Sequence, residues 1–182
     1  MPSVNISDIA WDRIQRLAKL MNVSPEAIAS DILNNITPLI EYFLARALVS
    51  SVDVCRDVVN PNVIDLRLIL RRVSGEGRKD PVKEAIKRTV IYPAAFLLAI
   101  KLKFGRYPPS VRIDEVTHML SKESLRYGPK ALVAHGLAKL DKNTVNLINR
   151  SEVYDTFIDC AERLSAELRF GVLRNIMKKI AR

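Results

Sequence analysis

The longest apolar stretch of the chain constrains its fold more than any other feature. Residues 90–100 (VIYPAAFLLAI) run for eleven residues without a charged or strongly polar side chain, and Pro93 lies among them. A membrane-spanning helix needs about 20 apolar residues, so this stretch is too short to cross a bilayer. It predicts a helix buried in a protein core, with a helix at a membrane surface as the alternative. We expect no membrane partner.

Basic residues are unevenly distributed along the chain. The sequence has 182 residues, an ordinary globular composition and a net charge of +9, which favours a polyanionic partner. Residues 1–50 carry four basic and five acidic side chains, residues 51–110 carry twelve and six, and residues 111–182 carry thirteen and nine. A polyanion is therefore expected to bind beyond the first fifty residues.

The two cysteines give no metal or disulfide pattern. Cys55 and Cys160 lie 105 residues apart, without CxxC or CxxH spacing. This argues against a disulfide scaffold and against a zinc module, and it predicts a reducing environment. The first residues lack the basic start and apolar stretch of a signal peptide, so we expect a cytoplasmic protein.

The first fifty residues predict one short strand followed by helices. Residues 3–7 alternate polar and apolar side chains, as in a strand. Ser7 or Asp8 can cap a helix of about fourteen residues, and residues 24–26 (SPE) begin a second helix that ends near Ile36. The Thr37–Pro38 pair repeats the pattern and predicts a third helix.

This strand, helix, turn and helix over residues 1–36 resemble the ribbon-helix-helix family of DNA-binding dimers. The resemblance implies a homodimer in which one strand from each subunit enters the major groove of DNA. It implies DNA contacts from Ser3, Asn5 and Ser7 on the strand, and from the start of the second helix at Ser24. The alternative is that these elements form only the core of an intertwined dimer.

The middle of the chain is strongly basic. Residues 63–73 fit a strand or a helix equally well, and residues 74–77 (SGEG) predict a turn. Asp80 and Pro81 begin a helix that Pro93 kinks or restarts and Gly105 ends. We expect a stripe of cations to face phosphates, unless it serves only to keep the surface soluble: Arg71, Arg72, Arg78, Lys79, Lys83 and Lys87.

Residues 105–150 predict two helices and a hairpin. A short helix begins near Asp114, a second lies within residues 121–136 with an interruption at Gly128–Pro129, and residues 137–148 form two strands around a turn. With residues 94–104 as a first helix, this order is similar to a winged-helix module, whose wing follows its recognition helix. The resemblance implies phosphate contacts from Lys130, Lys139 and Lys142, although winged helices also serve as protein-contact modules.

The last segment predicts a long amphipathic helix. Apolar residues recur every three or four positions from Val153 to Ile180, and Gly171 divides the pattern. Its partner could lie in the same chain or in another subunit.

The sequence contains no pattern typical of an enzyme. It has no nucleophile and base pair, no metal-ligand set and no phosphate loop, so we expect no catalysis, no cofactor and no metal. The two histidines, His118 and His135, are expected to be hydrogen-bonded at the edge of a core.

Together these patterns predict a mainly α protein with short β elements. Residues 1–50 form a ribbon-helix-helix-like dimerisation unit, 51–80 a basic connecting segment, 81–150 a helical, winged-helix-like domain ending in a hairpin, and 151–182 an amphipathic helix. The expected function is homodimeric DNA binding through phosphates, as a transcription regulator or a chromatin-type binder. The alternative is a helical scaffold or assembly subunit that binds another protein.

Overall fold

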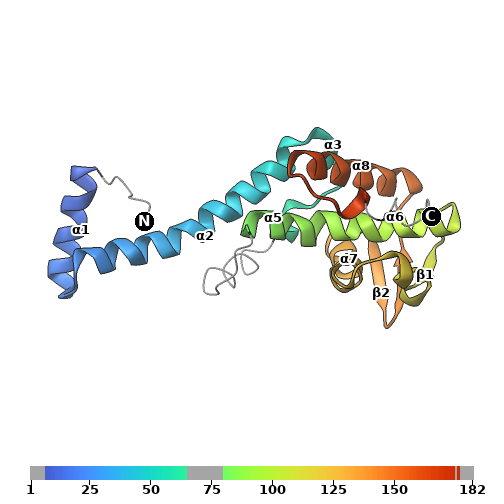
Figure 1. Ribbon diagram of the computed structural model, residues 1–182, viewed down its shortest axis with the longest axis horizontal. Coiled ribbons are helices and arrows are strands. Elements are labelled where there is room, and N and C mark those ends of the chain that lie inside the picture. The colour runs from blue at the N-terminus through green and yellow to red at the C-terminus, as the bar shows by residue number, and fades with distance from the viewer. Residues whose placement is uncertain (1–6, 65–79, 175, 177–182) are drawn as a thin grey trace. The chain divides into compact units, whose positions relative to one another are not determined.

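The protein is mainly helical and has one small antiparallel sheet, which confirms the predicted fold class. The computed structural model describes residues 7–64, 80–174 and 176 (Figure 1). Contacts divide the chain into two compact units, Met1–Ile40 and Glu41–Arg182. No helix within the described ranges combines the length and the apolar character that crossing a membrane requires.

The first unit is built from two capped helices. Helix α1 (Asp8–Met21) begins where the Ser7 hydroxyl accepts a hydrogen bond from the Ala10 amide, and it ends at Asn22, which has a left-handed backbone (φ 54°). Helix α2 (Pro25–Ser51) begins in this unit and ends in the second. A small core of Ile14, Ala18 and Ile28 lies between α1 and α2. The predicted strand falls on residues outside the described part, except Ser7.

Helix α2 continues through Pro38, so the predicted break at Thr37–Pro38 is wrong. Proline has a helical φ, and what it lacks is the amide that would donate to the carbonyl four residues earlier, here Asn34. Asn34 is exposed, so water can reach that part of the helix. The same cap-and-proline pattern therefore marks a helix start at Ser24 but not at Thr37.

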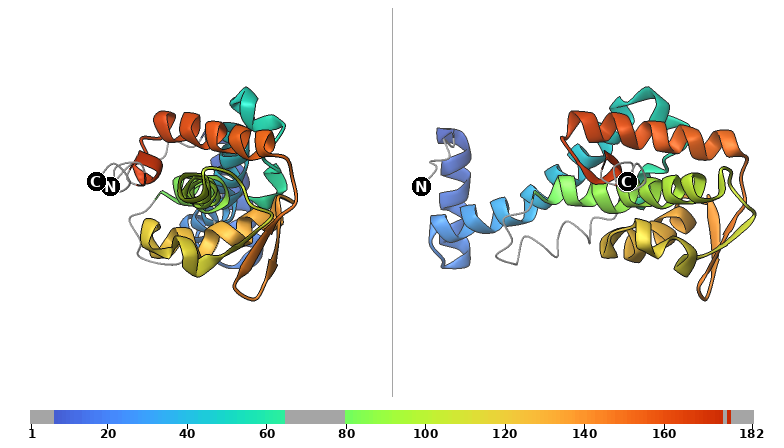
Figure 2. Two further views of the ribbon diagram at one scale, coloured as in Figure 1. Left: turned by 90° about the vertical axis from the view of Figure 1, so that its right-hand side faces the viewer. Right: turned by 45° about the vertical axis from the view of Figure 1, so that its right-hand side comes forward.

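The second unit is arranged around one buried helix. Every residue from Tyr92 to Ile100 in α6 is buried, which confirms the predicted core helix. Figure 2 shows α6 between α8 on one side and α7 on the other. The elements in chain order after α2 are α3 (Asp53–Arg56), η1 (Pro61–Val63), α5 (Pro81–Ile86), η2 (Lys87–Ile91), α6 (Tyr92–Phe104), β1 (Ser110–Arg112), η3 (Ile113–Met119), α7 (Lys122–Ala134), β2 (Ala138–Asp141), β3 (Thr144–Leu147) and α8 (Ser151–Glu167).

Pro93 restarts the central helix, as predicted. The Asp80 carboxylate caps α5 by accepting from the Lys83 amide (3.1 Å), and the chain then widens into the π-helical turn η2 before Pro93 enters the first turn of α6. Because η2 runs directly into α6, the amide that Pro93 lacks leaves the Thr89 carbonyl available to another donor. Gly105, with a left-handed backbone (φ 66°), ends α6.

The sheet has three antiparallel strands in the order β1-β3-β2. The predicted hairpin is present as β2 and β3, and Lys142 in its turn has a left-handed backbone (φ 49°). Strand β1 was not predicted. It pairs Val111 with Val145 of β3, and a three-residue strand has too short a pattern to be recognised in the sequence.

Helix α7 is continuous, so the predicted interruption at Gly128–Pro129 is wrong. Gly128 instead lets α7 approach α6. A Cβ at this position would lie 3.0 Å from both the Cβ of Phe96 and the carbonyl oxygen of Tyr92. Close packing of the two helices keeps α7 helical across a pair of residues that disfavours a helix.

The predicted C-terminal helix is divided next to Gly171: α8 ends before it, the backbone is helical again at residues 172–174, and α8 packs within its own chain. Helix α8 ends at Glu167, and Arg169, not Gly171, takes the left-handed backbone (φ 58°). The Phe170 amide then donates to the Ser165 carbonyl (2.8 Å), a bond typical of a helix terminus. Phe157, Ala161 and Leu164 are buried in the core of the second unit, so these residues of the apolar face have their partner in the same chain.

A disulfide joins Cys55 of α3 to Cys160 of α8, and both residues are fully buried. The expectation that argued against a disulfide is therefore wrong. A separation of 105 residues in sequence gives no information about distance in space, and here α3 packs directly on α8. The predicted cytoplasmic location relied on unpaired thiols and stays a prediction.

Candidate nucleic-acid interface

The exposed face of α7 carries three cations at helical spacing. Lys122, Arg126 and Lys130 are all exposed and lie four residues apart, so they share one face of the helix. Within the described part of the chain, none of them forms an ion pair with a carboxylate. The Arg126 guanidinium lies over the neighbouring Tyr127 ring, 5.3 Å from its centroid. Lys130 was predicted to contact phosphate; Lys122 and Arg126 were missed, although their spacing is visible in the sequence.

Two further exposed lysines lie on the hairpin that follows α7. Lys139 on β2 and Lys142 in the β2–β3 turn are both exposed, with the acidic Asp141 between them. Because β2 follows α7 and packs against it, the predicted residues Lys130, Lys139 and Lys142 lie on adjoining elements. We call Lys122, Arg126, Lys130, Lys139 and Lys142 the basic face.

Helix α7 is fixed firmly on the core beneath it. The Ser121 hydroxyl caps the helix by accepting from the Ser124 amide (3.1 Å). In the middle of the helix, the Tyr127 ring stacks on Tyr92 of α6, with centroids 6.0 Å apart. The Arg88 guanidinium covers the same ring at 4.5 Å and bonds Glu84 at 2.9 Å. These contacts set the direction in which the basic face points.

His135 anchors the end of α7. Its Nδ1 accepts a hydrogen bond from the Asn60 amide (3.2 Å), so its Nε2 carries the proton and donates to the Thr89 carbonyl (2.6 Å). In a regular helix that carbonyl would accept from residue 93, which is a proline without an amide. Burial lowers the pKa of His135 more than the bond to Thr89 raises it, which favours the neutral ring. The expected hydrogen-bonded histidine is confirmed at this position.

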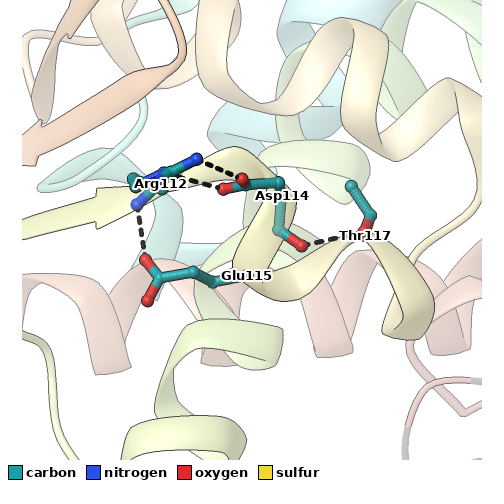
Figure 3. A network of polar contacts seen from close by, with 4 residues as sticks. All are labelled: Arg112, Asp114, Glu115 and Thr117. Carbon is teal, nitrogen blue, oxygen red and sulfur yellow. Dashed lines mark hydrogen bonds and ion pairs between the residues drawn. The ribbon is translucent and has the colours of Figure 1, made fainter.

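Arg112 is exposed and basic, but its side chain has a structural partner (Figure 3). Its guanidinium donates twice to Asp114, at 3.2 and 2.6 Å. The Glu115 carboxylate accepts from the Arg112 amide (2.8 Å), and the Thr117 hydroxyl donates to the Asp114 carbonyl (2.9 Å). This network shapes the turn from β1 into η3 and leaves Arg112 outside the basic face.

The opposite side of the second unit is acidic. Helix α8 carries five acidic side chains and one basic one, Arg163: the acids are Glu152, Asp155, Asp159, Glu162 and Glu167. Asp155 accepts hydrogen bonds from Lys101 (2.7 Å) and Tyr107 (2.6 Å). Burial raises the pKa of Asp155, but these two bonds outweigh it and lower the pKa. Figure 2 shows α6 between α7 and α8, so the helix that carries the three cations and the helix that carries the five acids lie on opposite sides of α6.

The remaining predicted contact residues are dispersed or outside the described residues. Ser7 and Ser24 are exposed in the first unit, where their hydroxyls cap α1 and α2, and the Ser24 hydroxyl occupies the Ala27 amide (3.1 Å). Lys83 is exposed, whereas the Lys87 ammonium lies 4.9 Å from the centre of the Phe170 ring. Ser3, Asn5, Arg71, Arg72, Arg78 and Lys79 lie outside the described residues.

The first unit exposes much of its apolar surface. Large hydrophobic residues with exposed side chains lie on both helices and on the turn between them, within residues 7–40: Ile9, Leu17, Leu20, Met21, Val23, Ile32, Leu33, Ile36, Leu39 and Ile40. A groove of about 460 Å³ runs between α1 and α2, with Ile9, Leu17 and Ile32 among its walls. Apolar surface on this scale is typical of a protein interface.

Comparison with known proteins identifies no family or relative for this chain. No protein-family model, no curated protein and no solved structure matches the chain.

Proposed function

We propose that the chain is a homodimeric DNA-binding protein that contacts duplex DNA mainly through phosphates, as a transcription regulator or a chromatin-type binder. The observation that carries this proposal is the division of charge in the second unit. The basic face on α7 and the hairpin attracts a polyanion, and the acidic α8 on the other side of α6 repels it. The field of this unit therefore orients DNA toward α7.

The order of elements supports the same proposal. Helix α6, strand β1, helices η3 and α7, and the β2–β3 hairpin follow one another in the order expected of a winged-helix module. In that arrangement α7 is the recognition helix and the hairpin is the wing. The basic face occupies both of these elements.

The apolar surface of the first unit supports a homodimer. The exposed fractions of its ten large hydrophobic residues add up to about five fully exposed side chains. Four of them line one groove between α1 and α2, so this part of the apolar surface is continuous: Ile9, Leu17, Ile32 and Leu33. A second copy of the same unit would cover this surface, as the ribbon-helix-helix resemblance implies.

Salt dependence of DNA binding tests the proposal. If each of the five cations of the basic face neutralises one phosphate, the slope of log affinity against log salt concentration is about −4.5 per chain. Fluorescence anisotropy with a 20-base-pair duplex at several salt concentrations measures this slope. Absence of binding, or a slope near zero, contradicts the proposal.

A scaffold function is the second candidate, because the apolar surface of the first unit could bind a different protein. In that case the purified chain would be monomeric and would bind its partner in a fixed stoichiometry that nuclease treatment does not change. Sedimentation of the chain alone separates the two candidates, since only the first requires a homodimer.

A further inference from the structure

We propose that α7 binds the sugar–phosphate backbone without regard to base sequence, with its three cations following consecutive phosphates of one strand. This inference rests on the proposed function and specifies its ligand. Binding of this kind is expected of a protein that covers or organises DNA and not of one that recognises a specific operator sequence.

The spacing of the cations supports backbone binding. Lys122, Arg126 and Lys130 lie four residues apart, and four residues of α-helix rise about 6 Å. Consecutive phosphates of a B-form strand are about 7 Å apart, given a rise of about 3.4 Å per nucleotide. The three charges therefore match three phosphates in register, and the flexible side chains accommodate the small difference.

The same face offers little that can read a base edge. Direct readout commonly uses Asn or Gln amides for adenine and two-bond contacts from arginine or lysine for guanine. The exposed side chains of α7, all of which is described, are Lys122, Glu123, Arg126, Lys130, Val133 and Ala134, so no amide is among them. The Arg126 fork rests on the Tyr127 ring, and Tyr127 is itself packed on Tyr92.

Lysines dominate the basic face. Four of its five cations are lysines: Lys122, Lys130, Lys139 and Lys142. A lysine ammonium is a compact point charge on a flexible stem, so it binds phosphate without the fixed fork geometry of arginine. Glu123, the one acid exposed on α7, has the same sign as phosphate and weakens every complex to the same extent. These features predict affinity without base discrimination.

A comparison of duplexes tests the inference directly. We would measure the dissociation constants of the full-length protein for 20-base-pair duplexes of A·T-only, G·C-only and several mixed sequences at one salt concentration, and select ligands from a randomised pool. We expect affinities within about three-fold of one another and no enriched motif. A duplex bound more than about thirty-fold tighter than the others overturns the inference but leaves the proposed function intact. Absence of binding to any duplex overturns both.

Single substitutions separate charge from base reading. Lys122→Gln and Lys130→Gln should each weaken binding to all duplexes equally, by about three- to five-fold, and reduce the salt slope by about 0.9. Arg126→Lys retains the charge and removes the fork, so all affinities should stay within about two-fold of the wild type. A selective loss for G·C-rich duplexes in Arg126→Lys would overturn the inference, because it would show that the fork reads guanine.

Two further variants serve as controls. Glu123→Gln removes the acid from the same face and should strengthen binding to every duplex by about three-fold, whereas an effect confined to some sequences would show base contact and contradict the inference. Arg163→Gln removes an exposed positive charge from α8, on the opposite side of α6, and should leave all affinities unchanged. An equal loss in Arg163→Gln and Lys130→Gln would assign binding to net charge and would also overturn it. Thermal unfolding of each variant checks that it is folded.

Discussion

At the scale of single residues, the carbonyl of Thr89 shows how a proline in one helix is compensated by a side chain from another. Pro93 lacks the amide that would satisfy that carbonyl, and the Nε2 of His135 donates to it instead, from the end of α7. The other ring nitrogen accepts from the Asn60 amide. One neutral imidazole thus links three segments that are distant in sequence, and its protonation would remove the acceptor that Asn60 uses.

We expect this histidine to make folding sensitive to pH. Because burial lowers the pKa of His135 in the folded state, the unfolded chain takes up its proton first, near the ordinary value of 6.5. The contribution of His135 is therefore complete above pH 6.5 and is lost as the pH falls from 6.5 toward the lower folded pKa. Urea unfolding at pH 7.5 and at pH 5.0 measures this loss.

Matched variants isolate the contribution of His135. His135→Gln should lower the free energy of unfolding at pH 7.5 by about 1–3 kcal/mol, since it leaves buried groups with poorer partners, and should flatten the pH dependence. His118→Gln, at the exposed histidine, should do neither. If wild type and His135→Gln lose the same stability between pH 7.5 and 5.0, the assigned role of His135 is wrong.

At the scale of elements, helix starts were predictable and helix interruptions were not. Ser7, Ser24 and Asp80 each cap a helix by accepting from an amide three positions away, so the local sequence specifies these caps. Pro38 and Pro129, by contrast, lie inside continuous helices, whereas Pro93 lies at a helix start. Whether a proline interrupts a helix depends on packing and on solvent access to the carbonyl that loses its donor. The local sequence pattern gives no information about either.

Long-range pairing was the other part that the sequence did not reveal. Strand β1 forms only because Val111 meets Val145, more than thirty residues later. The cysteines meet because α3 packs on α8. The candidate site was predictable in part, because element order identified Lys130, Lys139 and Lys142. The spacing of Arg126 and Lys130 is visible in the sequence, but only the packing of α7 on α6 shows that this side of the helix is exposed.

The disulfide between α3 and α8 should contribute strongly to stability. It closes a loop of 105 residues, for which the loss of unfolded-chain entropy corresponds to about 4–5 kcal/mol. Thermal unfolding with and without dithiothreitol, with thiols counted by mass spectrometry, tests this expectation. The wild type should melt at a lower temperature once reduced, and a Cys55→Ala/Cys160→Ala variant should not respond to the reductant. Equal melting of the oxidised and reduced wild type would contradict it.

At the scale of the whole molecule, we expect two copies of the chain to associate. The exposed apolar residues of the first unit leave it with only a small core of its own, Ile14, Ala18 and Ile28. Four of these exposed residues line one groove between α1 and α2, and a continuous apolar groove is typical of a surface that a partner covers: Ile9, Leu17, Ile32 and Leu33. The dimer is thus expected to stabilise this unit as well as to join two DNA-binding units.

Substitution in the groove of the first unit should therefore separate the subunits. Leu33→Glu places a charge where the second copy is expected to pack, and analytical ultracentrifugation should show a monomer. Lys19→Glu, on an exposed position of α1 outside the groove, serves as the control and should stay dimeric. A wild-type chain that sediments as a monomer would contradict the dimer.

The most direct test of the central claim, that the basic face of the second unit binds nucleic acid, is the salt slope of a triple variant. In Lys122→Gln/Arg126→Gln/Lys130→Gln, the slope of log affinity against log salt should fall in magnitude from about 4.5 to about 1.8 per chain, because three phosphate contacts are lost. Arg163→Gln should retain the wild-type slope. A triple variant with the wild-type slope would show that α7 does not contact the phosphates, and the account would be wrong.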